Sequence, residues 1–266
     1  MRGGAPSIHG LGLTVMDHRG ARSFGHHGQL PGLFAEIAVF PELDATIVLI
    51  ANTSTLNPFA LGRALADSLF SGELRSRPPA TLPQPAPALA GLYHDPEDDV
   101  VVELAEDGSG GLRIGTAMVD VPLEWHQPGR FRPLWPMNHL ELAFAPDARA
   151  LVGHACGHPV RLTRLKPWIA SAADLHQVVG RYRQAALATV WTVERHGTDL
   201  ALAIEGPLGR QDFALRPLAP GLFQARMAEE PVGPYRPVLR LIEGNEGPAL
   251  LLSTDRTRAL PAVRVD

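Results

Sequence analysis

The 266-residue chain has only one cysteine, Cys156, so no disulfide can form within it, and its cysteine usage does not mark it as exported. No apolar run approaches the roughly 20 residues that cross a bilayer, and residues 1–6 lack the apolar core of a signal peptide. The net charge of -4 gives no reason to expect nucleic acid or a membrane surface as a partner. We therefore favour a cytoplasmic location, provided that Met1 is a genuine start.

Several motifs that carry enzyme chemistry are also missing. Lys166 is the only lysine, and the residue three positions before it is Thr163, so the chain has no Ser-x-x-Lys nucleophile box. It has no Gly-x-Ser-x-Gly elbow, so nothing supports an α/β-hydrolase. The glycines at 108–111 form neither a phosphate-binding loop nor a dinucleotide fingerprint, and we expect no cofactor.

The alternating residues His154, Cys156 and His158 are a group whose spacing invites a metal. On a regular strand they would share one face. A structural zinc site takes four ligands, and the sequence offers neither a second cysteine nor an evident fourth ligand. We therefore expect no metal.

The composition, 45% apolar and 20% charged, is that of an ordinary globular protein. Five prolines in ten residues predict a stiff, extended linker, which we place at 74–87. Before it, apolar runs predict strands at 34–40 and 45–51, and Asn57 followed by proline predicts the capped start of a helix. These few elements make a poor independent core, so residues 1–73 need a partner.

After the linker, short strand signals recur about every ten residues, separated by glycine, proline, aspartate and asparagine. This spacing favours small antiparallel barrels. The start of the first, Gly91-Leu92-Tyr93, recurs as Gly180-Arg181-Tyr182. We therefore predict a mainly β fold with two related eight-stranded antiparallel barrels, at 88–168 and 172–266.

The box Gly25-His26-His27-Gly28 lies between extended apolar runs. It resembles the last active-site box of the penicillin-recognising serine hydrolases, the family of class C β-lactamases and DD-peptidases. In that family a Lys-Thr-Gly or His-x-Gly box on an inner strand lines the active site, and an earlier Ser-x-x-Lys box supplies the nucleophile. With two barrels after it, the whole layout resembles the bacterial D-aminopeptidases, whose third box is His-x-Gly.

The resemblance implies that residues 1–73 are the C-terminal fragment of a β-lactamase-like α/β catalytic domain. The complete enzyme would release N-terminal D-residues, such as D-Ala, from short peptides and amides through an acyl-enzyme. Because the Ser-x-x-Lys and Tyr-x-Asn boxes are absent, we predict that the chain is inactive alone. Its implied partners are the missing N-terminal catalytic segment and a small peptide or amino-acid amide substrate. A homodimer is left open.

His26 and Gly28 are the active-site residues that the resemblance carries over. Gly28 would allow the substrate backbone to approach the strand closely. β-Lactamases of the family have a lysine at the position of His26, where it meets a substrate carboxylate. A largely neutral imidazole removes that fixed cation, so we hypothesise that His26 selects a free amine. His27 should point to the opposite face of a regular strand, with packing or solvent as its expected role.

Two other functions stay open on the sequence. One is another β-lactamase-like hydrolase, such as an esterase or DD-peptidase. The other is a non-catalytic protein whose barrels hold a small apolar ligand, as lipocalin-like barrels do. The missing catalytic boxes favour the binding protein. The His-Gly box counts against it, because the box would have no functional role in such a protein.

The segment 227–235 carries Glu229 and Glu230 beside prolines and a glycine, a pattern typical of a protruding loop. In the D-aminopeptidases a loop of the last domain reaches into the catalytic cleft and contacts substrate. The resemblance therefore implies that these carboxylates bind the substrate ammonium. The alternative is a solvated acidic turn, where such a pair contributes about 1 kcal/mol or less.

Replacing both Glu229 and Glu230 by alanine in the complete enzyme tests this interpretation. The Michaelis constant for substrates with a free amine should rise, because the ammonium loses its partner carboxylates. An unchanged Michaelis constant would leave only the solvated turn.

Overall fold

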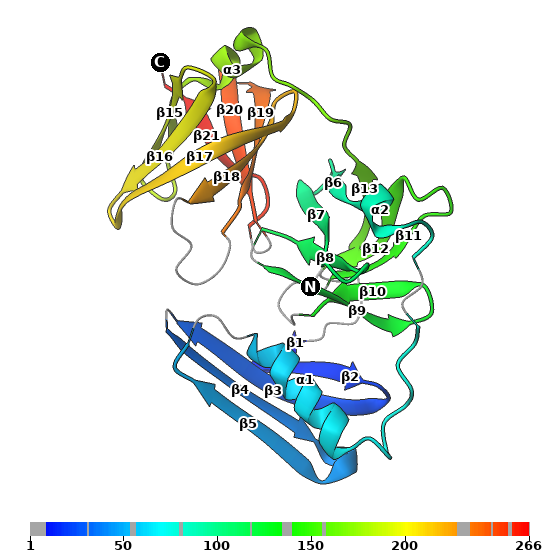
Figure 1. Ribbon diagram of the computed structural model, residues 1–266. Coiled ribbons are helices and arrows are strands. Elements are labelled where there is room, and N and C mark those ends of the chain that lie inside the picture. The colour runs from blue at the N-terminus through cyan, green and yellow to red at the C-terminus, as the bar shows by residue number, and fades with distance from the viewer. Residues whose placement is uncertain are drawn as a thin grey trace.

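A computed structural model describes residues 9–30, 32–53, 57–79, 82–117, 119–134, 140–155, 158–227, 235–245, 247–254 and 257–265. The fold is mainly β and has three parts (Figure 1). A five-stranded antiparallel sheet with a 12-residue helix comes first, and two closed barrels of eight antiparallel strands follow. No helix within these ranges has the length and apolar character needed to cross a membrane.

The first part, which we call the sheet unit, has its strands in chain order across the sheet. Its elements are β1 (His9–Gly10), β2 (Leu13–His18), β3 (Ala21–Leu30), β4 (Leu33–Phe40), the 3-10 helix η1 (Pro41–Leu43), β5 (Ala45–Ala51) and α1 (Pro58–Leu69). The predicted strands and helix are confirmed. Asn57 caps α1, since its side-chain oxygen accepts a hydrogen bond of 2.9 Å from the backbone N–H of Ala60.

Helix α1 covers only one face of the sheet. On that side a small core forms, in which Phe40, Ile47 and Ala66 are buried. The opposite side, which we call the open face, carries six apolar side chains that are each between 39% and 81% exposed. They are Leu13, Val15, Leu33, Ile37, Val48 and Ile50. The strand register places them on one face, because Ile37 pairs with Val48 and successive side chains along a strand point to opposite faces. The sheet unit thus has a small core on one side and exposed apolar side chains on the other.

The first barrel follows a four-residue helix, α2 (Ala86–Leu89). Its strands are β6 (Gly91–Asp95), β7 (Val100–Glu106), β8 (Leu112–Gly115), β9 (Asp120–Gln127), β10 (Arg130–Pro133), β11 (Leu140–Phe144), β12 (Ala150–Ala155) and β13 (His158–Arg164). Its interior is filled with side chains such as Tyr93, Phe131 and Leu142, each 0% exposed.

The second barrel follows the helix α3 (Ala172–Val178). Its strands are β14 (Gly180–Gln184), β15 (Thr189–His196), β16 (Asp199–Gly206), β17 (Gly209–Ala219), β18 (Leu222–Met227), β19 (Val238–Gly244), β20 (Gly247–Ser253) and β21 (Leu260–Arg264). Trp191, Phe223 and Leu250 pack its interior. Both eight-stranded barrels were predicted and are confirmed. The helices α2 and α3 were not predicted, because each is too short to show apolar periodicity.

The repeated Gly-x-Tyr sequence corresponds to a repeated pair of hydrogen bonds between each barrel and the short helix before it. The buried hydroxyl of Tyr93 donates a hydrogen bond of 2.8 Å to the carbonyl of Leu89, and that of Tyr182 donates one of 2.7 Å to Val178. In each barrel the tyrosine on the first strand therefore satisfies a carbonyl at the end of the short helix before it.

An arginine on the last strand of each barrel also hydrogen-bonds to the end of the short helix. Arg164 donates to the carbonyls of Ala88 and Ala90, and Arg264 donates to those of Gln177 and Val179. Both arginines therefore close the barrel against the helix that precedes it.

The two barrels contact each other through charged and apolar groups. Glu103 of the first barrel lies 3.5 Å from Arg216 and 3.4 Å from Arg226 of the second. Beside these pairs, an apolar cluster joins Val101 to Leu218 and other side chains of the second barrel.

The repeated tyrosine predicts a specific loss of stability. Tyr182→Phe should lower the free energy of unfolding by about 1–3 kcal/mol, because it leaves the Val178 carbonyl buried without its donor. Urea unfolding measures the loss. Tyr235→Phe is the control, since Tyr235 makes no hydrogen bond among the described residues. Equal stability of Tyr182→Phe and the control would contradict the assigned role.

Candidate functional site

The His-Gly box lies on β3, where the register alternates its residues between the two faces of the sheet. His26 pairs with Ile37, and Gly28 pairs with Ala35. Because Ile37 belongs to the open face, His26 and Gly28 lie on that side, and both are exposed. The structure therefore brings the two predicted active-site residues together on the uncovered side of the sheet.

The two glycines of the box differ in what the fold requires of them. A Cβ atom at Gly25 would lie 1.8 Å from the carbonyl oxygen of Ile37, so packing between β3 and β4 demands a glycine there. A Cβ atom at Gly28 would meet nothing within 4 Å. Internal packing therefore explains Gly25 but not Gly28, which leaves open space beside His26.

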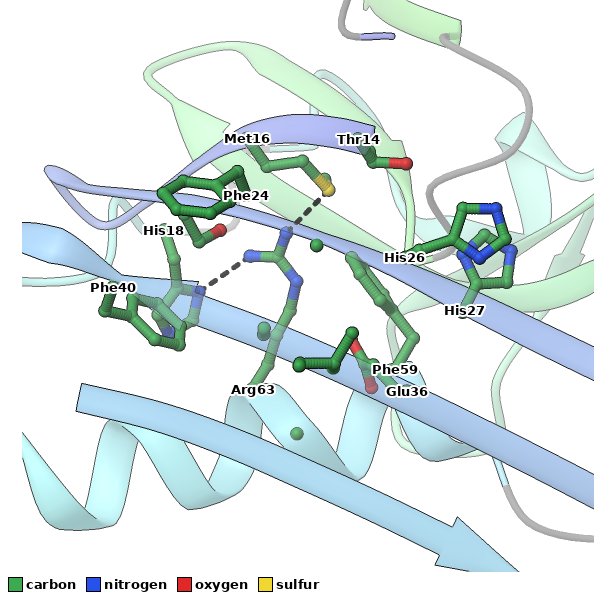
Figure 2. A pocket seen from close by; sticks show the side chains of 15 residues that line it. Thr14, Met16, His18, Phe24, His26, His27, Glu36, Phe40, Phe59 and Arg63 are labelled. Atoms are coloured by element: carbon green, nitrogen blue, oxygen red, sulfur yellow. Dashed lines mark hydrogen bonds between the residues drawn. The ribbon is translucent and has the colours of Figure 1, made fainter. Parts of the chain in front are cut away.

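His27 lies on the other face of β3 from His26. It pairs with Glu36, a position on the helix-covered side, and is half-buried. Its ring nevertheless lies stacked on that of His26, with the centroids 5.8 Å apart and the planes at 22°. Figure 2 shows the two imidazoles side by side at one end of a cavity. The register thus agrees with the expectation that His27 lies on the opposite face from His26, although the two rings also stack.

This cavity lies between α1 and strands β2, β3 and β4 and has a volume of about 40 Å³. We call it the Arg63 cavity. Met16, Glu36, Phe59 and Arg63 line its inner part, and His26 lines the same cavity at the other end (Figure 2). By volume it has room for a few water molecules.

Arg63 is the central charge of this cavity. Its guanidinium carbon lies 4.4 Å above the ring of Phe59. Its Nη1 donates to His18 Nδ1 at 2.7 Å and to the carboxylate of Glu124, on the first barrel, at 3.1 Å. Burial lowers the pKa of Arg63 to about 10, with the charge of Glu124 acting in the opposite direction.

His18 connects Arg63 to a further carboxylate. An arginine can only donate, so Nδ1 of His18 accepts from Arg63, and Nε2–H donates to Asp67 at 3.0 Å. Burial, followed by the charge of Arg63, lowers the pKa of His18 despite the nearby Asp67. His18 is therefore a neutral relay between a cation and an anion.

Asp67 is held ionised by arginines at the edge of the sheet unit. Burial raises its pKa, but hydrogen bonds from Arg77 and Arg19 outweigh burial and bring the pKa down to about 2. Arg19 Nη1 lies 2.7 Å from its carboxylate.

Glu36 is the one carboxyl group of the Arg63 cavity that lacks a partner. Its Oε2 atom is buried and makes no hydrogen bond to any described residue. Burial raises the pKa of Glu36 to about 7, although the nearby charge of Arg63 opposes the shift. The carboxyl group of Glu36 packs against Gly62 of α1. A Cβ atom at that position would lie 2.9 Å from Glu36 Oε2, so a larger residue there would crowd the carboxyl group.

The first barrel completes this charge network. Glu124 on β9 accepts from Arg63 and, at 2.7 Å, from Arg132 on β10. Burial raises the pKa of Glu124, but the charges of Arg63 and Arg132 outweigh it and lower the pKa. Arg132 also donates to the backbone carbonyl of Asp17 at 3.1 Å. Two arginines and one carboxylate therefore join the sheet unit to the barrel.

Other predicted site residues are not brought to this place. Glu229 and Glu230 lie outside the described residues, as does Cys156. His154 and His158 lie on neighbouring strands of a hairpin, since Ala155 pairs with His158. The idea that they share the face of one strand is therefore wrong.

The sequence motifs do not include the buried charged residues of the site. Glu36 interrupts an otherwise apolar strand, and Arg63 lies among the apolar residues of α1. An ionisable residue on the buried face of an element was the signal available for both.

No protein-family model and no curated protein matches this chain. Among solved structures, the octameric penicillin-binding protein homologue from Pyrococcus abyssi is similar over 98% of this chain and 37% of its own, with 15% identity and a TM-score of 0.26. SurE is similar over 59% of this chain and 37% of its own, with 23% identity and a TM-score of 0.26. SurE with D-Leu gives 22% identity, 59% and 38% coverage and a TM-score of 0.25. The chain spans less than two fifths of each of these proteins.

The buried Glu36 predicts that stability falls as the pH rises from about 5 to about 7. Its folded pKa of about 7 exceeds the ordinary 4.5, so the folded state binds the proton more tightly. The stabilisation is complete below the ordinary pKa and is lost as the pH rises through the folded pKa. The loss amounts to roughly 2–3 kcal/mol.

Glu36→Gln should flatten this pH dependence, because glutamine does not ionise. Urea unfolding at a series of pH values measures the effect. The control is Glu73→Gln, at an exposed glutamate of the same unit. Parallel curves for Glu36→Gln and the control would contradict the assignment.

Proposed function

We propose that this chain forms one wall of the active site of a D-aminopeptidase-type serine hydrolase. In this proposal the open face, with His26 and Gly28, closes against a segment outside these 266 residues that carries the nucleophilic serine. The observation that carries the proposal is the exposure of the box together with the apolar side chains around it.

The open face supports the proposal through its hydrophobicity. Full burial of a single large aliphatic side chain is worth about 1.5–3 kcal/mol. Six such side chains are exposed together on one side of a sheet, whereas exposed apolar residues of a soluble protein are usually scattered. A partner surface that covers part of this face would be bound tightly and would place its groups beside His26.

The chemistry at His26 supports an amine substrate. The imidazole is exposed and lies beside the open space at Gly28. A histidine side chain is not a permanent cation, whereas a lysine carries a fixed positive charge. A substrate ammonium therefore meets no fixed cation on this side chain, whereas a lysine there would repel it and attract a carboxylate.

The reaction implied by the family resemblance is acyl transfer. The serine oxygen bonds to the substrate carbonyl carbon, the bond from that carbon to the leaving nitrogen breaks, and the serine proton ends on the leaving amine. Water then hydrolyses the ester and releases the free D-amino acid. In this scheme His26 and Gly28 bind and orient the substrate, and the serine, its lysine and the tyrosine come from the other wall.

The alternative of a lipocalin-like binding protein has less support. A barrel that holds a ligand needs an internal space. Here Tyr93 and Phe131 fill the first barrel and Tyr182 and Trp191 fill the second, each at most 2% exposed.

The genomic reading frame around Met1 tests the proposal. We expect an upstream extension that encodes Ser-x-x-Lys and then Tyr-x-Asn. The protein made from the extended frame should release D-Ala from D-alanine amides, and the 266-residue chain should not. A frame without these boxes, or an extended protein that hydrolyses only penicillins or esters, would contradict the proposal.

A substitution in the extended protein tests the role of His26. His26→Lys should reduce kcat/KM for D-alanine amides by about tenfold or more, because a fixed cation then faces the substrate ammonium. N-acetylated substrates should lose much less. His196→Lys, on an exposed strand of the second barrel, is the control. Equal losses for both substrate classes would rule out selection by His26.

A further inference from the structure

A second cavity lies where the sheet unit, the linker and the first barrel meet. It has a volume of about 90 Å³, and we call it the junction cavity. Four arginines and two carboxylates are among its lining residues: Arg19, Arg75, Arg77, Arg132, Asp17 and Glu124. Figure 1 shows the linker passing along this side of the molecule between α1 and α2.

The charges around the junction cavity do not balance. Arg63 shares Glu124 with Arg132, and Asp67 accepts from Arg19 and Arg77. The cluster thus contains five guanidinium groups and three carboxylates, those of Asp17, Asp67 and Glu124. Two positive charges are left over, and one remains even with Glu36 counted as ionised.

The carboxylates at the cavity are already engaged. Glu124 accepts hydrogen bonds from two arginines, and Asp17 accepts one of 3.0 Å from the backbone N–H of Gly20. Both carboxylates are already included in this balance, so the excess positive charge remains.

Arg75 is the arginine without a partner. Its guanidinium makes no hydrogen bond or ion pair to any described residue. Its place is nevertheless fixed, because its backbone N–H donates to Arg19 at 2.8 Å and its carbonyl accepts from Arg19 Nε at 2.6 Å. The side chain lies across Gly20, where a Cβ atom would come within 2.6 Å of Arg75 Nε.

We propose that the junction cavity binds a dianionic phosphate group, with Arg75 as its main ligand and Arg77 and Arg132 beside it. A guanidinium donates paired hydrogen bonds that match the geometry of phosphate oxygens. Phosphate carries up to two negative charges near pH 7, which match the two unbalanced positive charges. The volume admits a small tetrahedral anion in place of a few waters.

The phosphate would act as a clamp between three parts of the chain. Arg19 lies on the β2–β3 turn, Arg75 and Arg77 on the linker, and Arg132 on β10 of the first barrel. Arg77 is 59% exposed, so the cavity is reached from solvent. This site is separate from the open face and does not depend on the proposed hydrolase.

Calorimetric titration of the 266-residue chain with inorganic phosphate at constant ionic strength tests the proposal. We expect one saturable site that sulfate, a tetrahedral dianion, also occupies and chloride does not. Arg75→Gln should weaken phosphate binding by about tenfold or more, because it removes charge-assisted hydrogen bonds. The control is Arg149→Gln, at an exposed arginine of the first barrel whose side chain makes no described hydrogen bond.

Two further measurements check the folding of the variants and the identity of the bound phosphate. Thermal unfolding without phosphate shows whether Arg75→Gln is folded, and Arg77→Gln provides a second variant should it not be. Phenyl phosphate compared with inorganic phosphate distinguishes a free anion from a phosphate carried on a larger molecule. Absence of saturable binding, or equal affinity in the variants and the control, would overturn the proposal.

Discussion

Burial of the five-stranded sheet on one side only is the constraint on which the rest of the structure depends. Helix α1 covers Phe40 and Ile47, whereas Ile37 and Val48 are left to solvent on the other face. Because side chains alternate along a strand, the register that buries Glu36 must also present His26 to the open face. The position of the box therefore follows from the same alternation that builds the small core.

A buried arginine joins this incomplete unit to the first barrel. Arg63 is 7% exposed and hydrogen-bonds to His18 and Glu124. Buried ion pairs add little net stability, but removing one partner leaves the other charge buried and unpaired, which is strongly destabilising. The buried hydrogen bonds of Arg63 therefore link the sheet unit to the first barrel.

Much of the fold followed from local patterns, and the buried network did not. The capped start at Asn57, the strand over 45–51 and the repeated Gly-x-Tyr motif each carry a short-range signal, and each is found in the structure. His26 and Gly28 were found through a motif. Arg63 was missed because its partners, His18 and Glu124, lie 45 and 61 residues away, a separation that no local pattern reports. The ring stacking of His26 on His27 likewise depends on side-chain rotation rather than on strand period.

Thiol labelling most directly tests the proposal that a segment outside these 266 residues covers the open face. A Val48→Cys variant in a Cys156→Ser background places a single thiol on this face. We predict rapid labelling in the 266-residue chain and labelling slower by about tenfold or more in the protein made from the extended reading frame. Leu208→Cys, at a fully exposed position of the second barrel, should label equally fast in both. Equal rates at Val48→Cys would contradict the account.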